Sequence, residues 1–320
     1  MKNPFDLAGM PAALSSTLSR RRKRGQTNRN AIFELNDDDA YLRWREDKLE
    51  HAVLAPDELI VEINDPNMLT ATERAELHSR IKRCSMAIYA TRAEMDEAAV
   101  QRLAAQFGWH QPDANWLAGE TGISRITVCR EAGTRQTYIP YTDRAIKWHT
   151  DGYYNPPERQ IHGMVLHCVQ SAGVGGINRV MDHEIAYLML RDENPDFIRA
   201  LSIPNAMTIP ERTDEKGIAR AAQTGPVFSV DQAEGTLHMR YTARTRSIEW
   251  HAATLAAVAQ LEHLLASDSP HIHSLTLENG MGLISHNVLH DRSAFTDDPS
   301  RPRLLYRARY LNRLAADQAV

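Results

Sequence analysis

The chain has 320 residues, of which 42% are hydrophobic and 24% are charged, and its formal net charge is −4 at pH 7. A chain of this length buries a sizeable core and suits one catalytic domain better than several independent ones. With 37 basic against 41 acidic side chains, the overall charge gives no attraction to nucleic acid.

The cysteines and the apolar segments indicate the compartment. Cys84, Cys129 and Cys168 are isolated and lack Cys-x-x-Cys spacing, which is typical of reduced structural cysteines. No stretch has the length and apolarity of a signal peptide or a membrane span. We therefore expect a cytoplasmic protein that does not bind membranes.

The predicted elements place helices first and strands later. Residues 1–36 include a basic run and little periodicity, so we expect a disordered tail ahead of a single domain over 37–320. Thr70 and Glu73 have the spacing of a capping box. The helices expected in chain order cover residues 37–49, 71–84, 95–107, 184–190 and 252–265. The strands expected cover 85–90, 164–169 and 179–182.

His149 and Asp151 form a His-x-Asp pair. On a strand, residues two positions apart point to the same face. An imidazole and a carboxylate, completed by a distant second histidine, form the ligand set that holds non-heme Fe(II) and leaves three positions open. The pair alone is weak evidence in a chain with 14 histidines and 41 acidic residues, and a hydrogen-bonded pair without metal is the alternative.

A late histidine-rich segment could supply the third ligand. His286 and His290 are both candidates, and a basic strand follows them. Arg303 lies 13 positions after His290 (303 − 290) and shares its strand parity with Arg307 and Arg309. If that strand is regular, one of its faces is strongly basic and favours anions.

Three blocks together resemble a known family. They are His149 to Asp151, the glycine pair Gly175-Gly176, and the late histidine with its basic strand. They are similar to the Fe(II)- and 2-oxoglutarate-dependent dioxygenases of the taurine and chlorophenoxyacetate type, which include the γ-butyrobetaine and glutarate hydroxylases. The resemblance implies a mainly β fold with flanking helices, in which the strands form a double-stranded β-helix, or jelly-roll barrel.

The resemblance also implies roles for individual residues. His149, Asp151 and His290 would bind Fe(II), with His290 preferred to His286. Arg303 would grip the distal carboxylate of 2-oxoglutarate, because a guanidinium makes two parallel hydrogen bonds to a carboxylate; Arg301 is the alternative. The resemblance places Asn178 where the family often has a threonine or serine that contacts 2-oxoglutarate.

The substrate side is less specific. By the same resemblance, Arg307 would contact the acidic group of the primary substrate, although it could instead be structural. Tyr153 could form a wall of the pocket, and Arg244 or Arg246 could reach the substrate or simply lie on a charged surface strand. The expected partner is a small carboxylate or sulfonate.

The predicted activity is that of an oxygenase. O2 and 2-oxoglutarate would be consumed, succinate and CO2 released, and a C–H bond of the substrate hydroxylated. A zinc hydrolase could use the same three ligands, and a barrel that binds a small anion without turnover is a second alternative. We expect no nucleic acid partner, and homo-oligomer formation is left open.

Overall fold

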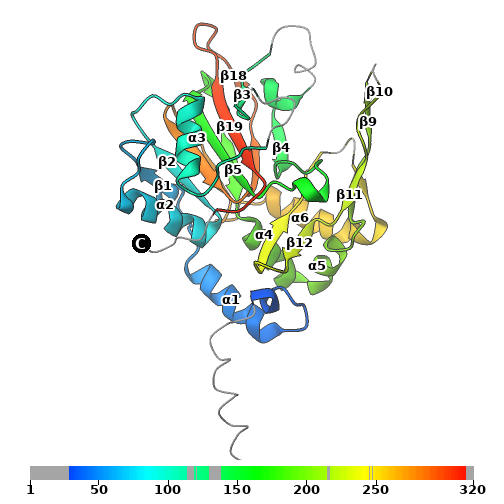
Figure 1. Ribbon diagram of the computed structural model, residues 1–320. Coiled ribbons are helices and arrows are strands. Elements are labelled where there is room, and N and C mark those ends of the chain that lie inside the picture. Colours follow the sequence, from blue (N-terminus) through cyan, green and yellow to red (C-terminus); the bar gives the residue numbers. More distant parts are fainter. Residues whose placement is uncertain are drawn as a thin grey trace, which may run out of the picture.

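The computed structural model describes residues 29–113, 119, 121–129, 138–214, 217–244, 246 and 248–314. A large sheet forms one wall of the molecule and joins strands from distant parts of the sequence (Figure 1). Its strand order is β1 (Ile60–Glu62), β2 (Met86–Ala90), β16 (Met281–Ser285), β5 (Gly163–Gln170), β19 (Leu304–Tyr310) and β3 (Ser124–Ile126). All its neighbouring strands run antiparallel except β1 and β2.

A smaller sheet faces the large one. Its strand order is β15 (His273–Leu275), β7 (Asn178–Met181), β17 (Leu289–Arg292) and β4 (Ile146–His149). Val180 of β7 packs in one buried cluster with Leu166 and Leu305 of the large sheet. Two sheets that share an inner core in this way form the double-stranded β-helix, so the predicted jelly-roll barrel is confirmed.

Helices α2 (Ala71–Cys84) and α3 (Glu97–Ala105) cover the outer face of the large sheet (Figure 1). Tyr89 on β2 is fully buried in a cluster with Leu77 of α2 and Leu103 of α3. The predicted capping box is present, because the Thr70 hydroxyl accepts from Glu73 N and the Glu73 carboxylate accepts from Thr70 N. Local sequence thus fixes where α2 begins.

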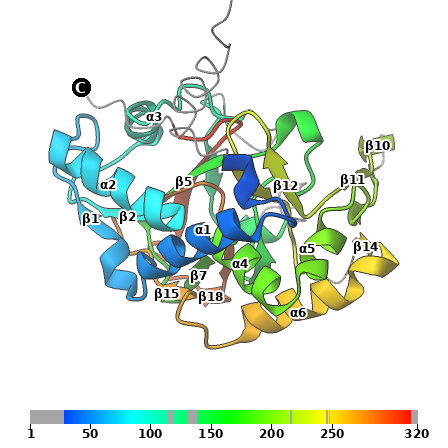
Figure 2. The ribbon, with the colours of Figure 1, turned by 90° about the horizontal axis from the view of Figure 1, so that it is seen from below.

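A second group of helices covers the outer face of the small sheet. Figure 2 shows α4 (His183–Glu193), α5 (Pro195–Leu201) and α6 (Leu255–Ala266) together on that side. Trp148 of β4 and Leu289 of β17 point outward into this apolar cluster, beside Leu261 of α6. The ring nitrogen of Trp148 also donates to Leu265 O at 3.0 Å. These contacts fix the two strands that carry the histidines of the candidate site.

The first described segment packs against α4. Residues 1–28 of the predicted tail lie outside the described residues, whereas η1 (Arg29–Ile32) leads into α1 (Asp38–Glu50). The ring centroid of Phe33 lies 5.5 Å from that of Tyr187. Lys48 is buried and pairs with Asp182 at 2.7 Å. The chain from Arg29 onward is therefore part of the packed structure.

An insert between β7 and β17 forms the remaining short strands. They are β8 (Met207–Ile209), β9 (Arg212–Asp214), β10 (Gly217–Arg220), β11 (Gln223–Gly225), β12 (Phe228–Asp231), β13 (Thr236–Met239) and β14 (Glu249–Trp250). The other short elements are β6 (Val174–Gly175), β18 (Phe295–Thr296), η2 (Pro56–Leu59), η4 (Ile139–Tyr141), η5 (Pro157–Arg159) and η6 (Ala252–Thr254). Over the described residues, no helix combines the length and apolarity that crossing a membrane requires.

The close approach of an aromatic ring to Gly163 yields a stability prediction. A Cβ built on Gly163 would lie 2.2 Å from Cζ2 of Trp109, whose ring stacks on Tyr310. Gly163→Ala should lower the free energy of unfolding by about 1–3 kcal/mol, because a rigid buried ring must move. Gly119→Ala is the control, since among the described residues its Cβ would meet nothing closer than 3.7 Å. Equal urea midpoints for the two variants would contradict this packing.

Candidate active site

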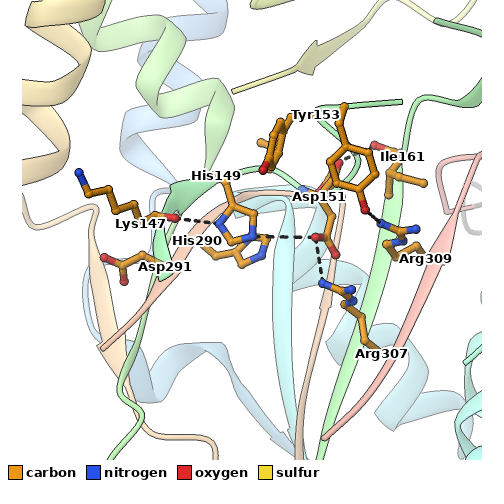
Figure 3. A network of polar contacts seen from close by, with 12 residues as sticks. Lys147, His149, Asp151, Tyr153, Ile161, His290, Asp291, Arg307 and Arg309 are labelled. Carbon is orange, nitrogen blue, oxygen red and sulfur yellow. Dashed lines mark hydrogen bonds and ion pairs between the residues drawn. The ribbon is translucent and has the colours of Figure 1, made fainter. Parts of the chain in front are cut away.

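Three candidate ligands meet at the edge where β4 pairs with β17. His149 and His290 are directly opposite in the antiparallel register, and their ring centroids are 4.2 Å apart. His149 Nε2 lies 3.9 Å from Asp151 Oδ1. One ligand atom from each of the three residues falls within 4.8 Å of the others, and all three residues are buried. Figure 3 shows Asp151 between His149 and Arg307.

The two imidazoles are oriented by hydrogen bonds to the backbone. His149 Nδ1 lies 2.9 Å from Lys147 O, and His290 Nδ1 lies 2.9 Å from Val288 O. A carbonyl oxygen only accepts, so each Nδ1 carries the proton and each Nε2 keeps a lone pair. Burial, with repulsion from His290, lowers the pKa of His149 to about 3. His149 is therefore neutral at physiological pH, as a metal ligand must be.

The carboxylate of Asp151 is charged and incompletely satisfied. Burial would raise its pKa, but Arg307 and Arg309 outweigh that effect and hold the pKa below the usual range. Arg307 Nη1 donates to Asp151 Oδ1 at 3.1 Å. Asp151 Oδ2 is buried and has no hydrogen-bond partner in the described chain. A buried carboxylate oxygen without a partner is costly, and a cation beside two imidazole lone pairs would satisfy it.

Asp151 is not on the strand. Strand β4 ends at His149, and Asp151 lies in the following turn, where Gly152 has a φ of +69°. The expectation that strand alternation places both ligands on one face is therefore wrong. The turn brings the carboxylate to the histidines instead.

Asn287 holds that turn in place, and sequence reasoning missed it. Its Oδ1 accepts from Asp151 N at 2.7 Å, and its Nδ2 donates to Asp151 O at 2.9 Å and to Ile161 O at 2.7 Å. Asn287 is buried and has a φ of +56°, a left-handed conformation that asparagine tolerates better than most residues. The same loop leads directly to His290. One amide thus ties the two ligand segments together.

His286 lies outside the group of three. It follows β16, in the loop before β17, and its Nδ1 is 2.8 Å from Nη2 of Arg313. The geometry therefore favours His290 as the third ligand.

A buried arginine pair lies next to the ring of Phe295. The Arg303 guanidinium is 5.0 Å and that of Arg292 is 4.7 Å from the centre of this ring. Arg292 donates to two carbonyls, at Thr142 and Arg144. The guanidinium of Arg303 has no hydrogen bond or ion pair within the described residues, although the residue is only 5% exposed.

The neighbours of this pair bear on the predicted co-substrate contacts. Asn178 pairs in register with Arg292, and its Nδ2 donates to Asp291 O at 3.2 Å. The second proton on that nitrogen remains available to a ligand. Arg301 is exposed and lies 3.9 Å from Asp298. That Arg292 lies beside Arg303 was not predicted from the sequence. Its position two residues after His290 on β17 places Arg292 and His290 on one strand face, which could have indicated it.

The basic strand faces the barrel interior. Leu305 belongs to the inner core, so Arg307 and Arg309, at the same parity, also point inward. Arg309 Nη1 donates to the Tyr154 hydroxyl at 3.0 Å, and its Nη2 donates to Asp113 at 2.9 Å. Arg307 and Arg309 therefore share one face of this strand, as predicted. Arg303 precedes β19, whose register shifts between Leu304 and Leu305, so it is placed by the loop.

The remaining predicted substrate contacts divide into two groups. The ring of Tyr153 lies edge-on to that of His149, with centroids 6.3 Å apart. Arg244 donates to the Tyr153 hydroxyl at 3.1 Å. Arg246 is exposed in a bend beyond β13. The structure thus brings Tyr153 and Arg244 to the site, and Arg246 lies outside these contacts.

Comparison with known proteins identifies the family. Residues 50–309 match the model of the taurine catabolism dioxygenase TauD, TfdA family. The chain belongs to this family. It is also 30% identical over 218 residues to a uridine-5'-phosphate dioxygenase from a Streptomyces species, an alignment that covers 64% of this chain and 76% of the relative.

Solved structures show that the fold is shared. A taurine dioxygenase from Burkholderia xenovorans superposes with a TM-score of 0.54 at 18% identity, covering 79% of this chain and 87% of that one. An asparagine oxygenase bound to Fe(II), 3-hydroxyasparagine and succinate gives 0.55 at 16% identity, covering 76% and 80%. The chain is an Fe(II)- and 2-oxoglutarate-dependent dioxygenase, so the predicted enzyme class and cofactors are confirmed over the two alternatives.

The Asn287 amide yields a prediction about metal affinity. Asn287→Ala removes the three hydrogen bonds that hold the Asp151 turn, so Fe(II) should bind about 10- to 100-fold more weakly. Asn279→Ala is the matched control, because within the described chain that exposed side chain accepts only from Ser171 N, at 2.7 Å. Anaerobic Fe(II) titration of both variants measures the effect. Unchanged affinity in Asn287→Ala would show that the turn holds its shape without this amide.

Proposed function

We propose that this dioxygenase hydroxylates a C–H bond of a small anionic substrate at iron held by His149, Asp151 and His290. When bound, iron and 2-oxoglutarate supply the O2-activating chemistry that inserts one oxygen atom into the substrate and leaves succinate and CO2. The single observation that carries the ligand assignment is the buried group of three side chains, in which both Nδ1 atoms bond to the backbone and Asp151 Oδ2 has no hydrogen-bond partner among the described residues.

Arg303 is our candidate for the residue that anchors 2-oxoglutarate. Its guanidinium makes no hydrogen bond among the described residues although the residue is buried, so its N–H groups are open to a ligand. A carboxylate fits the guanidinium with two parallel hydrogen bonds. Asn178 lies at the same end of the barrel and offers an N–H. Arg301, which is exposed, has no comparable need for a ligand.

Arg307 is the candidate for binding the anionic group of the substrate. It projects into the barrel and donates to Asp151, so its charge lies beside the metal site. Its Nε is buried without a partner in the described chain. An anion there would take up this donor and be held next to the iron. Tyr153, edge-on to His149, would form the adjoining wall, and Arg246 remains a predicted contact from the more exposed side.

The anion class includes carboxylates, sulfonates and phosphate monoesters. Carboxylate and sulfonate follow from the basic inner face of β19. Phosphate is added because the Streptomyces relative is, by its name, an enzyme for uridine 5'-phosphate. All three groups accept the hydrogen bonds that a guanidinium offers.

Substitution of Arg307 tests the substrate assignment. A hydrogen bond to a charged group contributes about 1.5–3 kcal/mol, so Arg307→Met should raise the substrate KM roughly tenfold to hundredfold and change the 2-oxoglutarate KM far less. The measurement is substrate-dependent O2 consumption with uridine 5'-monophosphate, taurine and small carboxylates. Iron content is determined in parallel, because Arg307 also contacts Asp151.

The control for this experiment is Arg199→Met, an exposed arginine of α5 paired only with Asp196 in the described chain. It should leave both KM values unchanged. Equal increases in the substrate and 2-oxoglutarate KM values for Arg307→Met, at full iron content, would reassign Arg307 to the co-substrate or to a structural role.

A further inference from the structure

Tyr153 and Tyr154 follow the turn that carries Asp151 and lie next to the candidate iron site. Tyr153 lies against His149, and Tyr154 accepts a hydrogen bond from Arg309, an inner-face residue of β19. The two tyrosine rings are in edge contact, with centroids 5.2 Å apart. Arg240 fixes this segment by donating to Tyr153 O at 2.7 Å. The two tyrosines therefore form an aromatic surface that is fixed in position and begins at the metal site.

The surface continues onto the β9–β10 hairpin. Arg212 and Arg220 are register partners across this hairpin. The Arg212 guanidinium lies 4.5 Å from the centre of the Tyr138 ring and is hydrogen-bonded to the Tyr138 hydroxyl. Arg220 interacts electrostatically with the hydroxyls of Tyr153 and Tyr154. Cationic and aromatic side chains from three separate segments thus gather on one side of the metal site.

Arg220 has an unused donor. Its Nη2 donates to Pro210 O at 2.7 Å, but its Nη1 is buried and has no partner in the part of the chain that the structure describes. Burial lowers the pKa of Arg220, and the nearby groups with the largest effect on it are the tyrosines and Arg212. A buried guanidinium N–H without an acceptor is unfavourable, so this position calls for an acceptor from a ligand.

We propose that Tyr138, Tyr154, Arg212 and Arg220 form a distal subsite for a planar ring that carries carbonyl acceptors, as the base of a pyrimidine nucleoside 5'-monophosphate does. Aromatic side chains and guanidinium planes stack on such rings, and an arginine N–H pairs with a ring carbonyl. The proposal rests on the proposed function, in which the anionic end of the same substrate lies at Arg307. The substrate is then held at both ends, with its phosphate beside the iron and its ring against the β9–β10 hairpin.

The test compares two ligands that differ only in the ring. Binding of uridine 5'-monophosphate and of ribose 5-phosphate is measured by calorimetry on the anaerobic protein loaded with Fe(II) and 2-oxoglutarate, where no turnover occurs. Uridine 5'-monophosphate should bind at least about tenfold more tightly, because the ring adds stacking and a hydrogen bond. Arg220→Met and Tyr138→Leu should each reduce this advantage and leave the affinity for ribose 5-phosphate unchanged. Arg199→Met should retain the advantage.

The outcomes separate this proposal from the one on which it rests. Equal affinity for the two ligands in the wild-type protein would overturn the ring subsite and leave the anion proposal intact. Failure of both ligands to bind, with Fe(II) and 2-oxoglutarate demonstrably present, would overturn the subsite together with the phosphate assignment. A tenfold advantage that survives in both Arg220→Met and Tyr138→Leu would place the ring elsewhere.

Discussion

The site depends on the antiparallel pairing of β4 with β17. This register sets His149 opposite His290, although the two residues are 141 positions apart in the sequence (290 − 149). The outer residues of the same strands, Trp148 and Leu289, are buried under the helices of the small sheet, so a slip of one residue would expose them and turn the histidines outward. Apolar packing on the outer face therefore determines where the metal ligands lie, and Asn287 adds the third ligand by holding the turn at Asp151.

Arginine side chains bring positive charge into the barrel interior. Arg307 and Arg309 are compensated by carboxylates of the protein, at Asp151 and Asp113 respectively. Arg303 makes no ion pair among the described residues, although the Asp297 carboxylate acts on its charge. A buried guanidinium that makes no hydrogen bond to the described protein favours a ligand whose carboxylate supplies the acceptors. The same reasoning, applied to an orphaned Arg220 N–H, extends the binding surface to the hairpin.

Much of the fold could be predicted because local signals are strong. The capping box of α2 depends on residues three positions apart, and α1, α4 and α6 all form near their predicted ranges. The three ligands and the enzyme class were predicted because separated motifs together resemble those of a known dioxygenase family. What sequence could not supply depends on tertiary contacts. Asn287 holds a turn 136 positions away in the sequence, and Asp151 reaches the metal site through that turn rather than through strand alternation. The position of Arg292 depends on its contacts with the Phe295 ring and with two carbonyl oxygens that are distant in the sequence.

The central claim is that His149, Asp151 and His290 hold Fe(II) while Arg303 holds 2-oxoglutarate against it. The most direct measurement is anaerobic addition of Fe(II) and then 2-oxoglutarate to the metal-free protein, followed by visible spectroscopy for the charge-transfer band of the chelate. The wild-type protein should develop the band, Asp151→Ala should lose it, and Arg303→Ala should require a much higher 2-oxoglutarate concentration. A band of wild-type intensity and concentration dependence in both variants would contradict the assignment.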